Sequence, residues 1–156
     1  MNFPVPSKIV CVGRNYAEHA KELGNAVPTE PLLFLKAPSS LNVDGGPIVI
    51  PSQSQQVEHE AELAIIISKQ CRDLGDDVNV KDYIQGYTCL NDVTARDIQR
   101  HDVQFTRGKS FDTFCPVGPI IVENLDTTDL EVICRVNGEV KQRGRTSQMV
   151  FSVDFL

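Results

Sequence analysis

The segment from Leu130 to Arg145 constrains the fold of this chain more than any other stretch. It reads LEVICRVNGEVKQRGR, with strand-forming residues on both sides of Asn137-Gly138. Asn-Gly supplies the two positive φ angles of a type I′ turn, whose twist matches that of a two-stranded antiparallel ribbon. The segment therefore predicts a β-hairpin in which each arm pairs with the other.

The rest of the chain alternates short apolar runs with proline and glycine, a pattern typical of short strands joined by turns. Strands are predicted at residues 7–13, 31–37, 46–52, 58–68 and 87–93. Helices are predicted at residues 14–24 and 94–101, a helical turn at 80–86 and a polar loop at 102–112. Many short strands with a few short helices indicate an α+β fold that is mainly β.

Length and charge narrow the class of protein. The chain has 156 residues, of which 41% are hydrophobic, so we expect one globular domain over residues 1–156. A net charge of -6, without a basic stripe, argues against a nucleic-acid partner. No apolar run has the length of a membrane span, and five scattered cysteines without a CxxC motif suggest reduced thiols. A cytoplasmic protein is therefore expected.

Three carboxylates alternate along VEHEAELAIIISK, residues 57–69. In a strand, Glu60 and Glu62 point to the same face with their Cβ atoms about 7 Å apart. Facing an interior, they would repel each other and lose hydration, and a hard cation such as Mg²⁺, Mn²⁺ or Ca²⁺ would relieve both problems. The alternative is a solvated strand face that also carries Glu58. His59 points to the opposite face and is interpreted as structural.

Other candidate residues have two interpretations each. Asp92 is either a third oxygen ligand or a helix N-cap. His19 and Glu22 share one helix face, so they form either a water-activating dyad or a salt bridge. Lys109 and Lys36 either pair with a substrate carboxylate or oxyanion, or are simply solvated.

Six blocks of the sequence, taken together and in order, resemble the fumarylacetoacetate hydrolase family. They are CVGRNYAEHAKELG, PLLFLKAPSSL, EHEAELAIII, GYTCLNDVTARDIQ, GKSFDTFCPVGP and VNGEVKQRGRTSQMVF. The resemblance covers essentially the whole chain. It looks closest to the short, single-domain branch that includes acylpyruvate hydrolases and oxaloacetate decarboxylases or tautomerases.

The resemblance implies a role for each candidate residue. Glu60, Glu62 and Asp92 match the family's ligands for a divalent metal, usually Mg²⁺ or Mn²⁺. His19 and Glu22 match the family's water-activating dyad, and Lys109 matches the lysine beside the metal that contacts substrate oxygens. Arg96 and Gln99 match residues that help to shape or contact the substrate site. Lys36 lies in a family block but is assigned no catalytic role.

The implied fold is the family's mixed β-sandwich roll, usually a homodimer. Family members continue beyond the position of Leu156 into further strands and a GTPxG-type segment. A C-terminal part of the family fold is therefore expected to be missing from this sequence.

The implied function is a Mg²⁺-dependent hydrolase that cleaves a carbon–carbon bond in 2,4-diketo acids such as acylpyruvates or fumarylpyruvate. His19 and Glu22 would activate a water that attacks the distal carbonyl, and Lys109 would stabilise the oxyanion. Cleavage of the carbon–carbon bond would then release a metal-bound pyruvate enolate. Oxaloacetate decarboxylation or keto–enol tautomerisation at the same site ranks second. A non-catalytic metal-binding domain ranks third.

Overall fold

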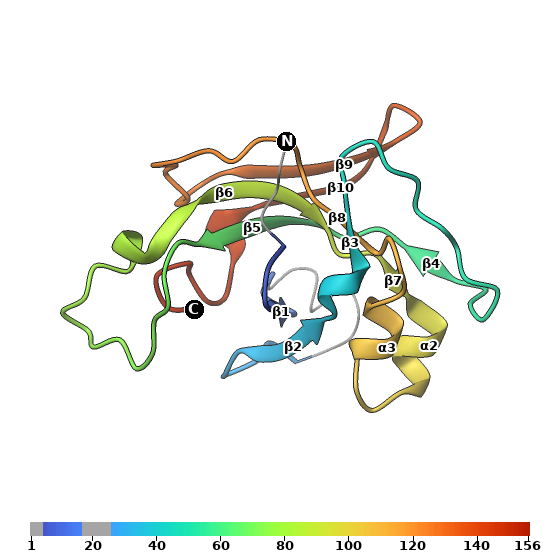
Figure 1. Cartoon of the computed structure of the whole chain (residues 1–156), viewed down its shortest axis with the longest axis horizontal. Helices are drawn as coiled ribbons and strands as arrows, with labels where there is room; N and C mark the ends of the chain where they lie inside the picture. The colour runs from blue at the N-terminus through green and yellow to red at the C-terminus, as the bar shows by residue number, and fades with distance from the viewer. Residues whose placement is uncertain (1–4, 17–25) are drawn as a thin grey trace.

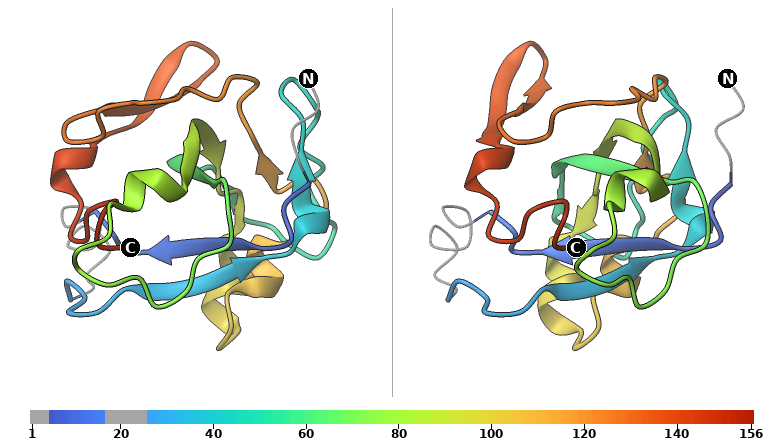
Figure 2. Two further views of the ribbon diagram at one scale, coloured as in Figure 1. Left: turned by 60° about the vertical axis from the view of Figure 1, so that its left-hand side comes forward. Right: turned by 90° about the vertical axis from the view of Figure 1, so that its left-hand side faces the viewer.

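Antiparallel two-stranded ribbons dominate residues 5–16 and 26–156, the part of the chain that this computed structural model describes (Figure 1). They are β1 (Ile9–Gly13) with β2 (Leu32–Lys36), β5 (Ala61–Ile67) with β6 (Ile84–Asn91), and β9 (Glu131–Val136) with β10 (Glu139–Arg145). The ribbon β5–β6 lies between the other two in the views of Figures 1 and 2. This layering leaves the inner faces of the ribbons to line the interior.

Shorter elements join the ribbons. Strand β3 (Leu41–Asn42) pairs in parallel with β8 (Cys115–Pro116), and β4 (Val57–Glu58) pairs antiparallel with β7 (Thr94–Ala95). The helices are α2 (Arg96–His101) and α3 (Thr106–Lys109), with 3₁₀ turns η1 (Pro38–Ser40), η2 (Val80–Tyr83) and η3 (Thr146–Gln148). The predicted mainly β, α+β fold is confirmed. None of the described helices is long and apolar enough to cross a membrane.

The predicted hairpin is confirmed at its turn. Asn137 and Gly138 have φ angles of 52° and 83°, in the left-handed region that a type I′ turn requires. Glu139 lies opposite Val136, so β9 and β10 pair directly across these two residues. Local turn chemistry therefore sets the register next to the turn, and a bulge between Val140 and Gln142 shifts the pairing by one residue farther along the ribbon.

A small apolar core supports the helices. Val93, Ala95, Ile98 and Phe114 are buried together, and the partly buried Phe111 packs against them. Val93 and Ala95 come from the short stretch between β6 and α2, so the core fixes the main chain directly after Asp92. The candidate ligand thus stands beside packed apolar side chains rather than on a free loop.

Three sequence predictions about secondary structure are wrong, and one of them, the unbroken strand at residues 58–68, is described with the site below. Residues 46–52 form no strand; the main-chain N–H of Val49 bonds instead to the Thr113 side chain, and the flanking Pro47 and Pro51 have no N–H for a ladder. Residues 102–112 are not wholly a loop, because they contain the one-turn helix α3. Most of the predicted helix at 14–24 lies outside the described residues.

Replacing Gly138 with valine tests the hairpin turn. A β-branched side chain at a φ of 83° is strained, so Gly138→Val is expected to lower the free energy of unfolding by about 1 to 2 kcal/mol. Urea denaturation followed by circular dichroism measures this. The control is Gly144→Ala in the same hairpin, where an added Cβ meets Tyr16 ring carbons at an ordinary 3.7 Å. Equal destabilisation by both variants would contradict the turn assignment.

Alkylation with iodoacetamide tests the burial of the thiols, all five of which are free. Burial raises the pKa of Cys11 to about 12 and that of Cys115 to about 11, so both stay protonated from pH 8 to pH 9.5. The exposed Cys71 and Cys89 are expected to react on the order of tenfold faster across this range. Mass spectrometry of peptides reads the rates, and denaturant should remove the difference. Rapid labelling of Cys11 in folded protein would refute the burial of its thiol.

Candidate active site

A break in the predicted strand at residues 58–68 places Glu60. The chain pairs with β7 up to Glu58 and with β6 from Ala61 onward, so Glu60 belongs to neither ladder. Its main chain is instead tied to the end of β6: its N–H donates to Asn91 Oδ1 at 3.0 Å, and its carbonyl accepts from the N–H of Asp92 at 2.8 Å. The two carboxylates therefore stand next to each other.

Lys109 connects these two carboxylates. Its buried ammonium Nζ lies 2.7 Å from Glu60 Oε2 and 2.7 Å from Asp92 Oδ2. The preceding Gly108 lets α3 approach α2 closely, because a Cβ there would lie 3.0 Å from the main-chain N of Gln99. The structure thus brings together three of the residues that the sequence singled out.

Arg96, the first residue of α2, holds the other side of Glu60. Its guanidinium donates to Glu60 Oε1, to Glu58 Oε2 at 2.8 Å and to Gln99 Oε1 at 2.6 Å. Although burial opposes ionisation of Glu60, its ion pairs with Lys109 and Arg96 lower its pKa. Arg96 and Gln99, predicted to shape the substrate site, are therefore joined to the carboxylate cluster; contact with a substrate stays a prediction.

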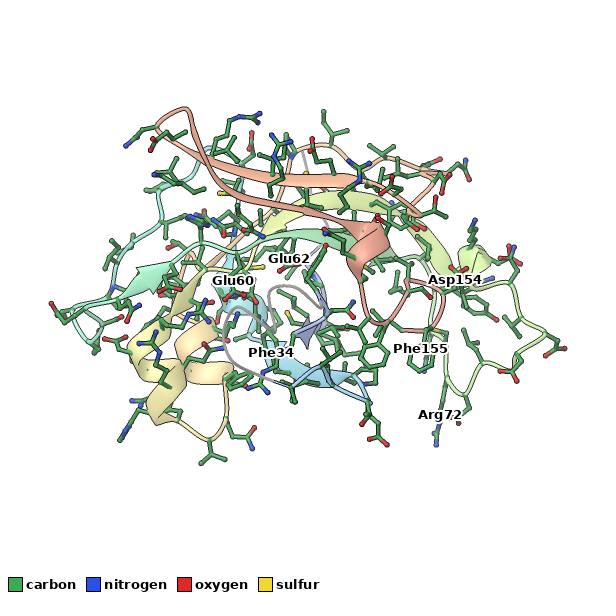
Figure 3. The ribbon with its side chains drawn as sticks, turned by 180° about the vertical axis from the view of Figure 1, so that it is seen from behind. Phe34, Glu60, Glu62, Arg72, Asp154 and Phe155 are labelled. Carbon is green, nitrogen blue, oxygen red and sulfur yellow. The ribbon has the colours of Figure 1, made fainter. Side chains whose placement is uncertain are left out.

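Glu62 is the carboxyl group of this cluster for which no direct ion pair is found within the described residues; the charge of Lys109 only partly offsets the rise in its pKa. Desolvation by the surrounding protein, together with the charges of Glu60 and Asp92, raises its pKa to about 8. It makes no hydrogen bond or ion pair with any residue in the described ranges. Figure 3 places Glu60 and Glu62 near each other at the centre of the molecule, above Phe34. A proton or a cation is needed to neutralise this group.

The chemistry of these donors fits a hard divalent cation. Glu60, Glu62 and Asp92 offer only oxygen atoms, the ligands that Mg²⁺ and Mn²⁺ prefer. Within residues 5–16 and 26–156, however, no three Asp, Glu, His or Cys side chains are arranged so that they could hold a metal ion together. Glu60 and Asp92 converge on the Lys109 ammonium instead, so a cation that bridged them would have to move it. The ligand assignment stays a prediction.

The alternative role of Asp92 as a helix N-cap is wrong. The residue that caps α2 is Ala95, which provides no side-chain hydrogen bond. Asp92 is only 5% exposed, and its two carboxylate oxygens accept from Lys36 and Lys109. Both oxygens are therefore used inside the cluster rather than at the helix end.

An open cavity gives access to the cluster. Its lining includes Glu60, Glu62, Asp92, Arg96, Gln99 and Lys109. Phe34 adds an apolar wall, because its ring centroid lies 5.0 Å from Lys109 Nζ and 5.7 Å from the ring of Phe105. His19 and Glu22, the predicted dyad, lie outside the described residues.

Sequence reasoning gave no role to Lys36, which the structure places in the cluster. Its side chain is buried, and Nζ donates to Asp92 Oδ1 at 2.7 Å. Alternation along LLFLK puts Lys36 on the same face as Phe34, opposite the exposed Leu33 and Leu35. A lysine on the inward face of a strand was a signal that a carboxylate lies opposite it.

Several curated proteins are similar to this chain. An uncharacterized protein of Methanocaldococcus jannaschii is 52% identical over 148 residues, covering 95% of this chain and 62% of the relative. The mitochondrial oxaloacetate decarboxylase of Dictyostelium discoideum is 47% identical, covering 96% of this chain and 71% of the relative. The mitochondrial oxaloacetate tautomerase of Arabidopsis thaliana is 44% identical, covering 99% and 71%. The chain thus spans roughly three fifths to seven tenths of these relatives.

Solved structures share the fold. A 5-carboxymethyl-2-hydroxymuconate delta-isomerase from Mycobacterium smegmatis superposes with a TM-score of 0.87 at 45% identity, covering 96% of this chain and 59% of the other. A fumarylacetoacetate hydrolase from Exiguobacterium antarcticum gives a TM-score of 0.87 at 46% identity, covering 97% and 56%. The family profile described as "Fumarylacetoacetate (FAA) hydrolase C-terminal" matches residues 8–156. The chain belongs to the fumarylacetoacetate hydrolase family.

Proposed function

We propose that this chain is an enzyme that binds Mg²⁺ or Mn²⁺ at Glu60, Glu62 and Asp92 and acts on a short 2-oxo acid. Oxaloacetate is the proposed substrate, with keto–enol tautomerisation or decarboxylation as the reaction. The observation that carries the proposal is geometric: Glu60 and Asp92 meet in one buried cluster, and both line the same cavity as Glu62. Burial and the charges of these two groups raise the pKa of Glu62 to about 8, which supports the proposal. Such a site is suited to a cation and its anionic ligand.

The side chains around the carboxylates supply the remaining chemistry. A bound divalent cation would act as a Lewis acid that favours the enolate of a 2-oxo acid. Lys109 Nζ, once free of Glu60 and Asp92, would donate to a substrate carboxylate or a developing oxyanion. Arg96 holds Glu60 and Gln99 in place through its guanidinium. The positive charges of Lys109 and Arg96 would also offset the negative charge that a dianionic substrate brings into the cavity.

Proton transfer is assigned to His19 and Glu22. Both tautomerisation and decarboxylation need a group that adds or removes a proton at the carbon next to the carbonyl. An imidazole oriented by a carboxylate suits this task near neutral pH. The names of the Dictyostelium decarboxylase and the Arabidopsis tautomerase, both specifying oxaloacetate, support this choice of substrate.

The second candidate function is hydrolysis of a 2,4-diketo acid such as an acylpyruvate, which the sequence ranked first. Its support is the similarity to the Exiguobacterium fumarylacetoacetate hydrolase. The same His19–Glu22 pair would then activate water instead of moving a carbon-bound proton. Assembly as a homodimer and a cytoplasmic location remain predictions of the sequence.

Replacing Glu62 with glutamine tests the role of the unbalanced carboxyl group. Glu62→Gln keeps the shape of the side chain but removes a ligand charge, so kcat/KM with Mg²⁺ is expected to fall on the order of a hundredfold or more. The matched control is Glu131→Gln, the same substitution at a residue of β9 that forms an ion pair with Arg143 and is not a proposed ligand. Full activity of Glu62→Gln would contradict the proposed ligand set.

Three assays on the unaltered chain decide between the reactions. Loss of the enol absorbance of oxaloacetate measures tautomerisation, pyruvate release from oxaloacetate measures decarboxylation, and carboxylic acid release from a short acylpyruvate measures hydrolysis. We expect Mg²⁺-dependent turnover of oxaloacetate, abolished by EDTA, after the metal-promoted background is subtracted. Faster acid release from the acylpyruvate would support the hydrolase instead. Turnover that survives complete removal of metal would contradict both candidate functions, the reaction on oxaloacetate and the hydrolysis of a 2,4-diketo acid.

A further inference from the structure

Lys36 is the most enclosed charged side chain of the described residues. Its residue is 1% exposed, although it ends a strand whose neighbouring residues Leu33 and Leu35 are 60% and 50% exposed. Taking an ammonium group out of water is costly unless its hydrogen bonds are replaced and its charge is paired. An apolar residue of similar size would fill the same space without that cost. The charge of Lys36 therefore needs an explanation.

The hydrogen bonds of Lys36 use the whole capacity of its ammonium group. Nζ donates to Asp92 Oδ1 at 2.7 Å, to the carbonyl of Val93 at 3.2 Å and to the carbonyl of Lys109. A protonated lysine has three N–H donors, and each has an acceptor here. No donor is left for a substrate oxygen, so Lys36 cannot do what Lys109 is proposed to do.

The three acceptors belong to two site residues, Asp92 and Lys109, and to Val93, a residue of the apolar core. Binding Oδ1 leaves Oδ2 as the oxygen of Asp92 that accepts from Lys109, whose ammonium also binds Glu60. Binding the carbonyl of Lys109 fixes the last residue of α3, from which the Lys109 side chain starts. The Lys36 ammonium group thus orients the carboxylate of Asp92, which follows β6, and fixes the main chain of Lys109, at the end of α3.

We propose that Lys36 is a positioning residue that holds the Asp92 carboxylate and the main chain of Lys109 in place for the binding of a divalent cation, while the Lys109 ammonium group stays free to move. The inference rests on the proposed function, because it concerns the same site. It makes a prediction opposite in sign to simple electrostatics. Removing a positive charge close to a cation site should tighten cation binding, whereas losing the orientation of a ligand should weaken it.

The test is the affinity of the purified chain for Mn²⁺, measured by electron paramagnetic resonance of the free ion. Lys36→Met removes the charge and keeps most of the volume, and Lys141→Met removes the charge of an exposed lysine as the control. We expect Lys36→Met to bind Mn²⁺ about tenfold or more weakly and the control to bind as the unaltered chain does. Circular dichroism confirms that each variant is folded.

The outcomes separate the two proposals. Mn²⁺ binding by the unaltered chain with equal or tighter binding by Lys36→Met overturns the role of Lys36 alone, since a purely structural residue changes stability without changing affinity. No Mn²⁺ binding by the unaltered chain overturns the proposed function and, with it, this inference.

A second measurement on the unaltered chain covers the case in which Lys36→Met does not fold. Nitrogen-15 NMR detects lysine ammonium groups that are shielded from water, and a Lys109→Met sample distinguishes the resonances of the two buried lysines. We expect the Lys36 resonance to persist in Mg²⁺-saturated protein, because a positioning residue keeps its bonds when the cation binds. Its disappearance on addition of Mg²⁺ would overturn the inference.

Discussion

The neutralisation of carboxyl groups drawn away from bulk water is the constraint on which the rest of this structure depends. Glu60 and Asp92 are satisfied only because cations reach them from separate parts of the chain: Lys36 from β2, Arg96 from α2 and Lys109 from α3. These ion pairs bridge up to 56 residues of sequence. Two ribbons and both described helices therefore meet at one polar cluster, and the apolar core flanks it on one side.

That arrangement explains why the site is asymmetric. Glu60 and Asp92 are held by ammonium and guanidinium groups. Burial, together with the charges of Glu60 and Asp92, raises the pKa of Glu62 to about 8. A cluster with an excess of carboxyl groups is poised to take up positive charge. Lys36 and Lys109 therefore have different proposed roles. All three N–H donors of the Lys36 ammonium group are used inside the protein, so Lys36 positions other residues. Lys109 contacts Glu60 and Asp92, and a bound cation would replace these contacts.

Sequence patterns predict the features that depend on neighbouring residues. Asn137-Gly138 determines the hairpin because its turn geometry is local, and the family blocks indicate the fold and the cluster of Glu60, Asp92 and Lys109. Long-range pairing was not predictable: the break at Glu60 exists because the segment pairs with β7 up to Glu58 and with β6 from Ala61 onward. Residues 46–52 have a strand-like composition but no partner strand. The role of Lys36 depends on acceptors 56 to 73 residues away.

Anomalous X-ray diffraction from crystals grown with Mn²⁺ would show whether Glu60, Glu62 and Asp92 bind a divalent cation. We expect an anomalous peak within ligand distance of these three residues, about 2.0 to 2.4 Å from their oxygens. We also expect that Lys109 Nζ no longer bridges Glu60 and Asp92, while Lys36 keeps its bond to Asp92. A peak elsewhere, or no peak with Lys109 still between the two carboxylates, would rule out this ligand set.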